Sequence, residues 1–240
     1  MRAMILLVVC VLSAVLPVSI TTSASAIAQP QALIISSIEK WSPMAHVDDM
    51  QNSLMNAGYQ VTFMHDNNVT VSFLLGDLGN FDLVVWRTDS YTTIDYRTFW
   101  YIGEVNNATS VQTHAADRAA GFLDDSNGII GVSSDFFRVH LGKTFPNRLK
   151  LMILESSMAE TLASTFVSLG VRTVIETYGT ITSFSSADAQ VAQVISFLTH
   201  GLDVQTSIAE LIAPYLGAWD SQNVEFPQIW YAGDPTLTLS

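Results

Sequence analysis

Residues 81–88 (FDLVVWRT) form a short, almost continuous apolar run that ends on polar side chains. Such a run is typical of a β-strand that is covered on both faces, as in a parallel sheet. The same pattern recurs three times along the chain, in residues 32–38 (ALIISSI), 149–154 (LKLMIL) and 171–177 (VRTVIET). We expect these four segments to be the core strands of one sheet.

Helical patterns lie between these strands. Apolar residues recur at helical spacing in residues 46–57, 157–169 and 186–200, and a glycine follows each segment. Alternation of strands and helices predicts an α/β fold with a mostly parallel sheet and helices on both faces. We expect residues 90–147 to be the least regular part and to supply loops that shape a site. Smaller elements are expected as strands at 59–64, 100–103 and 228–231 and helices at 70–75 and 206–215.

The first residues have the pattern of a secretory signal peptide. Arg2 precedes an apolar run over residues 4–18, and small residues follow it. The run is shorter than the roughly 20 residues that a membrane span needs. We therefore predict a leader over residues 1–26, with cleavage after Ala26 or Ala28, and one exported domain over residues 29–240 with no stable membrane insertion. The alternative is an uncleaved leader that keeps the protein at the cell surface.

The chain is strongly acidic. It has 10 Lys and Arg against 22 Asp and Glu, a net charge of −12. Nucleic acids and anionic membranes attract Lys- and Arg-rich surfaces, so both are unlikely partners on charge alone and neither is expected. A peptide or protein ligand of basic character fits this charge better.

Three segments carry a resemblance to a known family. Residues 69–90 (VTVSFLLGDLGNFDLVVWRTDS), 131–170 (GVSSDFFRVHLGKTFPNRLKLMILESSMAETLASTFVSLG) and 231–237 (YAGDPTL) resemble, in order and spacing, parts of the gingipain-type cysteine peptidases. The resemblance implies a caspase-like three-layer fold over residues 29–240. It also implies an endopeptidase ancestry, with a catalytic His after one core strand and a Cys after another.

Both catalytic positions of that family are substituted in this chain. Asp89 stands where the His is expected, Ser156 and Ser157 follow the second strand, and the one cysteine, Cys10, lies in the leader. Asp is a weaker base than His by about 2.6 pKa units, and a hydroxyl is a poorer nucleophile than a thiolate. The resemblance therefore implies a pseudopeptidase that acts in binding or scaffolding. The alternative is a hydrolase that uses Ser156 or Ser157, with Asp89 or a recruited His as its base.

Structural roles compete with these catalytic ones. Asp and Ser are common at turns and helix caps, and Ser157 has Glu160 at capping-box spacing. Of the five histidines, His114 and His140 lie in the irregular stretch and are the best candidates for a recruited base. No histidine pair has the spacing of a zinc motif, and we expect neither a metal nor a cofactor.

Two further groups of residues allow alternatives. The acidic runs at residues 48–49 and 124–128 could bind calcium, although the second reads first as a solvated turn. Aromatic residues cluster around Asp89, and Tyr91 and Tyr96 are the expected substrate-binding residues among them. These aromatic side chains support a third hypothesis, an extracellular peptide-binding or carbohydrate-binding module.

Overall fold

The computed structural model describes residues 28–142, 148–177, 179–215 and 228–239. The predicted leader, including the cleavage position at Ala26, lies outside the described residues. No helix within the described ranges is both long and apolar enough to span a bilayer.

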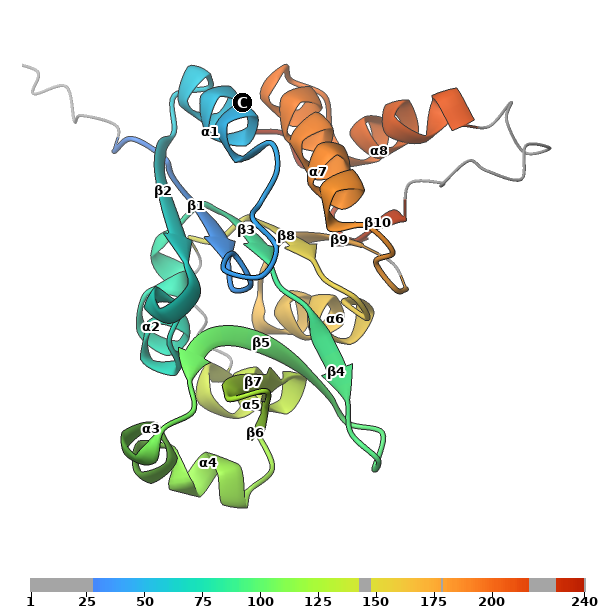
Figure 1. The fold of residues 1–240 in the computed structure, drawn as a ribbon. Coiled ribbons are helices and arrows are strands. Elements are labelled where there is room, and N and C mark those ends of the chain that lie inside the picture. The colour runs from blue at the N-terminus through green and yellow to red at the C-terminus, as the bar shows by residue number, and fades with distance from the viewer. Residues whose placement is uncertain (1–27, 143–147, 178, 216–227, 240) are drawn as a thin grey trace, which may run out of the picture.

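A six-stranded sheet forms the centre of the fold (Figure 1). Its strand order is β10-β9-β8-β3-β1-β2, and every neighbouring pair is parallel except β10 with β9. The predicted core strands are confirmed, with shifts of at most two residues at their ends. The strands are β1 (Gln31–Ser36), β2 (Gln60–His65), β3 (Leu83–Arg87), β8 (Leu151–Glu155), β9 (Thr173–Thr177) and β10 (Ile229–Gly233).

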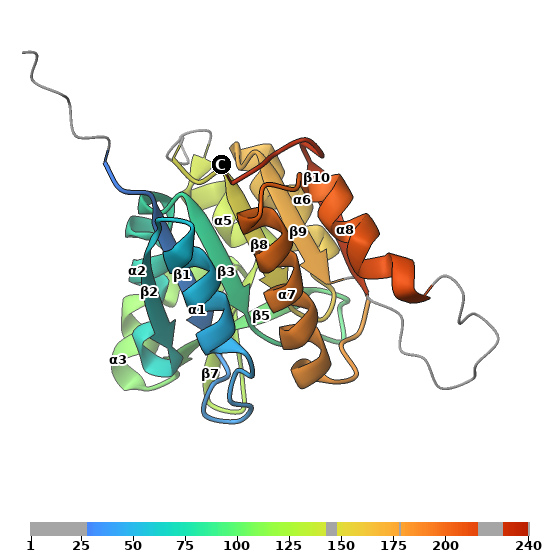
Figure 2. The ribbon, with the colours of Figure 1, turned by 90° about the horizontal axis from the view of Figure 1, so that it is seen from above.

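Helices cover both faces of this sheet (Figure 2). Helices α1 (Val47–Asn56), α7 (Phe184–Thr199) and α8 (Val204–Ile212) pack on one face. Helices α2 (Val71–Gly76), α5 (Ser134–His140) and α6 (Glu160–Leu169) pack on the other. Within the described ranges, short 3-10 helices lie in the connections at Asp66–Asn68, Leu78–Asn80 and Ala213–Tyr215.

The alternation of side chains along the strands divides the interior into two cores. Leu33 and Ile35 of β1 point to the α6 side, whereas Ala32 and Ile34 point to the α7 side. Both faces are apolar because successive strand side chains point in opposite directions and helices cover each face. This explains why the core strands read as continuous apolar runs.

A second, antiparallel sheet occupies the stretch that we expected to be irregular. Its order is β4-β5-β7-β6, with β4 (Ser90–Thr92), β5 (Thr98–Val105), β6 (Leu123–Ser126) and β7 (Ile129–Ser133), and it carries α3 (Ala108–Thr113) and α4 (Ala115–Ala119). The stretch is more regular than expected, and the short strand predicted at residues 100–103 is part of β5. Asn127 and Gly128 have φ of 55° and 78°, the backbone of a tight hairpin turn, and this Asn-Gly pair was the sequence signal for it.

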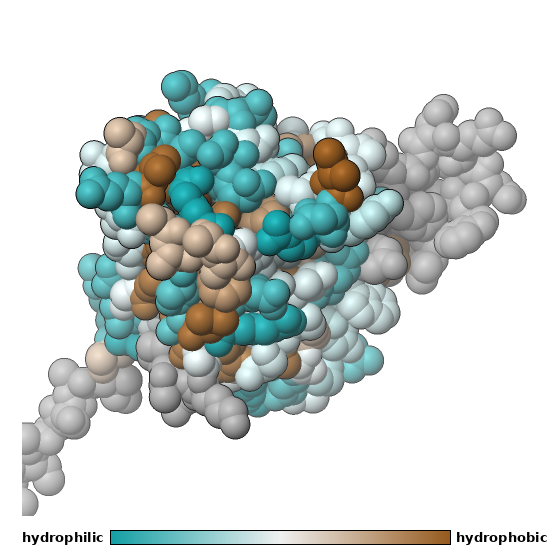
Figure 3. Space-filling view, turned by 90° about the horizontal axis from the view of Figure 1, so that it is seen from below, coloured by the Kyte–Doolittle hydropathy of each residue, from teal (hydrophilic) through white to brown (hydrophobic). Residues whose placement is uncertain are grey.

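Strand β5 bends sharply across the underside of the main sheet (Figure 1). Gly103, at φ 85°, lies where the pairing of β5 with β7 shifts register. A side chain there would overlap the backbone of Asp66, so only glycine permits this close approach. The fold is thus α/β, with a mostly parallel six-stranded sheet and a small, curved antiparallel sheet beside it. Figure 3 shows the side of the molecule that the small sheet and its helices form, where hydrophilic and apolar residues are interspersed.

Candidate functional site

The chain changes direction across the sheet at β1. Strand β2 pairs with one edge of β1, and β3 pairs with the other. In open α/β sheets, such a switch point leaves a crevice outside the carboxyl ends of the strands, where ligands commonly bind. Strand β1 ends at Ser36 and β3 ends at Arg87, and these two residues are register partners.

A pocket of about 430 Å³ opens beyond these strand ends. Its walls come from the segment after β1, the segment that joins β3 to β4, strand β5, the β6–β7 turn and the first residue of α7. The lining residues are Ile38, Trp41, Ser42, Asp89, Tyr101, Asn127 and Phe184. The expected site residue Asp89 therefore lies in a cavity, together with residues that sequence reasoning did not select.

Aromatic rings form much of this wall. Trp41 meets Tyr101 edge-on, with ring centroids 5.9 Å apart, and 51% of Trp41 is exposed. Tyr101 packs in turn against Tyr91 at 5.0 Å. Phe184 faces the pocket from the start of α7. Aromatic faces attract both apolar groups and cations.

Asp89 is the one charged side chain among the described residues that line the pocket. It is half-buried, and its Oδ1 accepts a hydrogen bond from the Ser90 amide at 2.8 Å. Its backbone carbonyl accepts from the Tyr101 amide, which fixes the residue against β5. The pocket therefore combines aromatic walls with one carboxylate.

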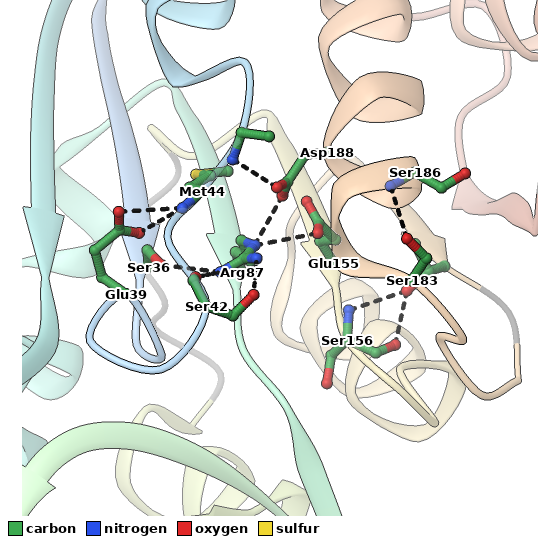
Figure 4. Close-up of polar contacts among 12 residues, drawn as sticks. Ser36, Glu39, Ser42, Met44, Arg87, Glu155, Ser156, Ser183, Ser186 and Asp188 are labelled. Carbon is green, nitrogen blue, oxygen red and sulfur yellow. Dashed lines mark hydrogen bonds and ion pairs between the residues drawn. The ribbon is translucent and has the colours of Figure 1, made fainter.

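A fully buried group of charged residues lies beneath the pocket (Figure 4). We call Arg87, Glu155 and Asp188 the Arg87 cluster. The Arg87 Nε donates to Asp188 Oδ1 at 2.7 Å and lies 3.4 Å from Glu155 Oε1. The Arg87 guanidinium also lies over the Phe184 ring, 4.7 Å from its centroid. The cluster thus touches a pocket wall directly.

Glu155 is the unbalanced member of the cluster. Both of its carboxyl oxygens are buried, and neither accepts a hydrogen bond from the described residues. Burial and the neighbouring Asp188 raise the pKa of Glu155 well above its usual range, although Arg87 opposes the shift. The neutral form of Glu155 is therefore favoured, and with Glu155 neutral the cluster carries one positive and one negative charge.

The two expected catalytic strand ends lie side by side. Strands β3 and β8 pair in parallel, with Arg87 opposite Glu155, and the Ser90 hydroxyl donates to the Ser157 carbonyl at 2.8 Å. The serine hydroxyls, however, are engaged. Ser156 Oγ donates to the Ser157 carbonyl at 3.1 Å, and Ser157 Oγ accepts from the Ile181 amide at 3.2 Å.

The expected helix cap at Ser157 is wrong. Helix α6 begins at Glu160, its N-cap is Ala159, and no side chain caps it. Met158, at φ 56°, turns the chain between strand and helix, so the helix starts later than the sequence pattern suggests. Ser157 instead orders the segment at Ile181.

The histidines lie apart from these serines. Among the described residues, the hydrogen bonds of the histidine rings go elsewhere: His46 to Asp49, His65 to Asp66, His114 to Glu104, His140 to Asp117 and His200 to the Ser196 carbonyl. His114 with Glu104 lines a separate polar pocket of about 390 Å³ beside α3. No contact in the described chain provides Ser156 or Ser157 with an imidazole base.

The two tyrosines expected to bind substrate are placed differently. Tyr91 lies on β4 and is stacked on Phe99, with centroids 5.6 Å apart, so it supports the pocket wall from behind Tyr101. Burial, with a smaller contribution from Asp124, raises its pKa above the ordinary tyrosine value. Tyr96 is 90% exposed at the β4–β5 turn, with φ 63°, and does not line the pocket.

The acidic runs lie on ordinary secondary structure. Asp48 and Asp49 are in the first turn of α1, where carboxylates stabilise the helix N-terminus. Asp124 and Asp125 lie on β6, and Asp125 binds Asn106 and Arg118. Across the described ranges, no three His, Cys, Asp or Glu side chains are grouped in a way that could hold a metal ion.

Comparisons with known proteins identify no family for this chain. No family model matches it, and no curated protein matches it. Among solved structures, it is similar to Drosophila melanogaster Ssu72 in complex with Symplekin and a phosphoserine peptidomimetic, at 11% identity and a TM-score of 0.30, over 85% of this chain and 96% of that one. A second structure, from a study of Ssu72 phosphatase activity on the C-terminal domain of RNA polymerase II, gives 10% identity and the same TM-score and coverage. These values are too low to transfer a fold or an activity.

The interpretation of three segments as gingipain-type is wrong. No gingipain model or curated gingipain matches the chain, and the structures reported above belong to a different protein. The segments at residues 69–90 and 131–170 each contain a core strand followed by small polar residues. Any buried parallel strand with a polar end has this sequence pattern, so the pattern does not specify a family.

Proposed function

We propose that the chain is a binding domain whose pocket takes a cationic group of a peptide or protein ligand. The observation that carries the proposal is the pairing of one carboxylate, Asp89, with the aromatic side chains of Trp41, Tyr101 and Phe184 in one cavity. A carboxylate supplies charge, and aromatic faces attract cations at up to about 2 kcal/mol when the contact is desolvated. Among the described residues, no basic side chain lines the pocket.

The charge of the whole chain favours the same class of ligand. A net charge of −12 produces a field that attracts cations and speeds their encounter with an acidic cavity. Arg87 does not reverse the sign at the pocket, because it is buried and paired with Asp188. Export through the predicted leader would place this binding activity outside the cell.

Binding is favoured over hydrolysis by the state of the serine hydroxyls. Both Ser156 and Ser157 are buried, and both hydroxyls already bind backbone groups of the protein. A nucleophile needs a base within hydrogen-bond reach, about 2.6–3.2 Å. The hydrolase therefore stays a hypothesis without a supporting contact. The caspase-like designation likewise stays a hypothesis, supported only by helices on both faces of a mostly parallel sheet.

Chemical-shift mapping of the full exported domain tests the proposal. The probes are tetramethylammonium and Nα-acetyl-arginine amide, and the neutral control is Nα-acetyl-citrulline amide. We expect the two cations to shift resonances of Trp41, Asp89 and Tyr101, and Trp41→Ala to abolish those shifts.

Trp230→Ala is the matched control, because Trp230 is an equally exposed tryptophan (58%) on β10, away from the pocket lining. This variant should keep the shifts of the wild-type protein. Equal shifts with the neutral amide, or shifts that gather on another surface, would contradict the proposal.

A further inference from the structure

The segment between β1 and α1 supplies three of the pocket-lining residues, Ile38, Trp41 and Ser42. The Arg87 cluster beneath it holds this segment in place. We propose that Arg87 is the positioning residue of the pocket, and that one proton shared by Glu155 and Asp188 keeps it there, so that loss of this proton loosens the pocket. The effect on ligand affinity rests on the proposed binding function, whereas the effect on the segment does not.

Arg87 binds the segment through both terminal nitrogens. Its Nη1 donates to the Ser42 carbonyl at 2.6 Å, and its Nη2 donates to Ser42 Oγ at 2.9 Å. A weaker contact at 3.4 Å joins Nη1 to Ser36 Oγ at the end of β1. The planar, forked guanidinium suits such simultaneous contacts, which lysine cannot reproduce.

Asp188 fixes the other end of the segment between β1 and α1, at Ala45. Its Oδ1 binds Arg87, and its Oδ2 accepts a hydrogen bond from the Ala45 amide at 2.7 Å. Asp188 lies on α7, one turn after Phe184, whose ring contacts the Arg87 guanidinium. One ion pair therefore fixes two walls of the pocket, the segment after β1 and the start of α7 (Figure 4).

The charges of the cluster balance only when one carboxyl is neutral. Arg87, Glu155 and Asp188 are each fully buried, with one cation facing two acids. The charged groups that act on Glu155 are Asp188 from α7 and Arg87 from β3. A proton on Glu155 makes it a donor towards Asp188, and the cluster is then neutral. An additional unpaired charge in such a site is strongly unfavourable.

Loss of the proton changes the partner of Arg87. Ionised Glu155 is a second carboxylate beside the guanidinium, with its Oε1 already 3.4 Å from Nε. It repels Asp188 and competes with it for Arg87. A shift of Asp188 or of Arg87 weakens the contacts at Ser42 and Ala45, because Arg87 binds Ser42 and Asp188 binds Ala45. The pocket should therefore be firm at low pH and looser at high pH.

Hydrogen exchange of the full exported domain tests the inference without any ligand. We expect the protection factor of the Ala45 amide, corrected for the intrinsic exchange rate, to fall by about tenfold or more as Glu155 ionises with rising pH. A difference of one pKa unit between the closed and open segment corresponds to a tenfold change in the equilibrium constant for opening. Glu155→Gln keeps the shape of the neutral side chain and cannot ionise. In this variant the protection factor of the Ala45 amide should not change with pH. The same pH dependence of that protection factor in the variant and the wild-type protein would overturn the inference.

A nearby histidine provides the control. His46 adjoins Ala45, and its ring binds Asp49 on the surface, so an imidazole lies next to the segment. His46→Gln should keep the pH dependence of the wild-type protein. Carbon-13 NMR of the wild-type protein is an independent measurement if Glu155→Gln does not fold: a Glu155 carboxyl that titrates at its ordinary value would overturn the inference.

The affinity for Nα-acetyl-arginine amide, measured at the same pH values, separates the two proposals. Affinity that falls with the loss of Ala45 protection supports both. A pH-dependent segment in a protein that binds no cationic probe supports the positioning role and contradicts the proposed function. Affinity for the probe with a pH-independent segment supports the function and overturns the inference.

Discussion

Arg87 and Glu155 are register partners at the last residue pair of two adjacent core strands, and both side chains are completely buried. Their closest atoms, Nε and Oε1, lie 3.4 Å apart, whereas Arg87 makes its shorter ion pair, at 2.7 Å, with Asp188 of α7. A charged group therefore ends the apolar core at the point where the pocket begins. This arrangement couples the stability of the fold to the shape of the candidate site.

Removal of the arginine should be far more costly than neutralisation of its second acid. We predict that Arg87→Met lowers the free energy of unfolding by about 3–5 kcal/mol, because it leaves Asp188 buried without its cation. Glu155→Gln should cost less than about 1 kcal/mol, because it leaves the ion pair of Arg87 with Asp188 intact and leaves no buried charge without a partner. Urea denaturation measures both values, and equal losses in the two variants would contradict the charge assignment.

The stability of the fold should decrease as pH rises from about 4.5 to about 7. Burial, followed by repulsion from Glu160, raises the pKa of Glu176 to about 7. An acid whose pKa is higher in the folded state stabilises the fold below its unfolded pKa, and this stabilisation is lost as pH rises through the folded value. We therefore expect the contribution of Glu176 to be complete below about pH 4.5 and lost as pH rises through about 7.

Glu176→Gln identifies the source of that pH dependence. The variant should lack the loss of stability between about pH 4.5 and 7 that the wild-type protein shows, since glutamine does not titrate. Thermal unfolding at a series of pH values measures the difference. Glu155 adds a loss of the same sign, so the double variant with Glu155→Gln should be the least sensitive to pH.

Gly131 on β7 should not accept a side chain. An added Cβ would lie 2.8 Å from the Tyr91 hydroxyl and 2.9 Å from Phe99 Cβ, so alanine would displace the stack that supports Tyr101. We predict that Gly131→Ala destabilises the protein by about 1–3 kcal/mol, as overpacking typically does. Gly76→Ala is the control, because nothing lies within 4 Å of its added Cβ and alanine favours the helix.

Ser157 should contribute to structure and not to turnover. Its hydroxyl accepts from the Ile181 amide, so Ser157→Ala should lower the free energy of unfolding by about 1 kcal/mol. Profiling of the protein against a peptide library should show no cleavage that Ser157→Ala removes. Cleavage that disappears in this variant would restore the hydrolase hypothesis.

Local patterns were sufficient to predict the main sheet but not the pocket. Apolar runs located β1, β3, β8 and β9, because a strand buried on both faces must be apolar throughout. Of strands β4 to β7, only part of β5 was predicted, at residues 100–103. The short strands β4, β6 and β7 lack the long apolar runs that identified the core strands. Their Asn127-Gly128 turn was the readable signal.

Local sequence patterns also predicted part of the candidate site. Asp89 was selected because it follows a core strand, and it does line the pocket. Trp41 precedes α1 and Phe184 begins α7, so the two residues are far apart in the sequence. The packing of α1 against α7 brings them to the same pocket. Asp188 reads as a polar residue of an amphipathic helix, so its burial with Arg87 was invisible in the sequence.

Calorimetric titration of the protein with Nα-acetyl-arginine amide, and separately with its neutral citrulline counterpart, tests the central claim most directly. The account predicts that the charged amide binds the wild-type protein about tenfold or more tightly than the neutral one, a difference of about 1.4 kcal/mol. It also predicts that Asp89→Asn removes this preference. Equal affinities for the two amides, or an unchanged preference in Asp89→Asn, would contradict it.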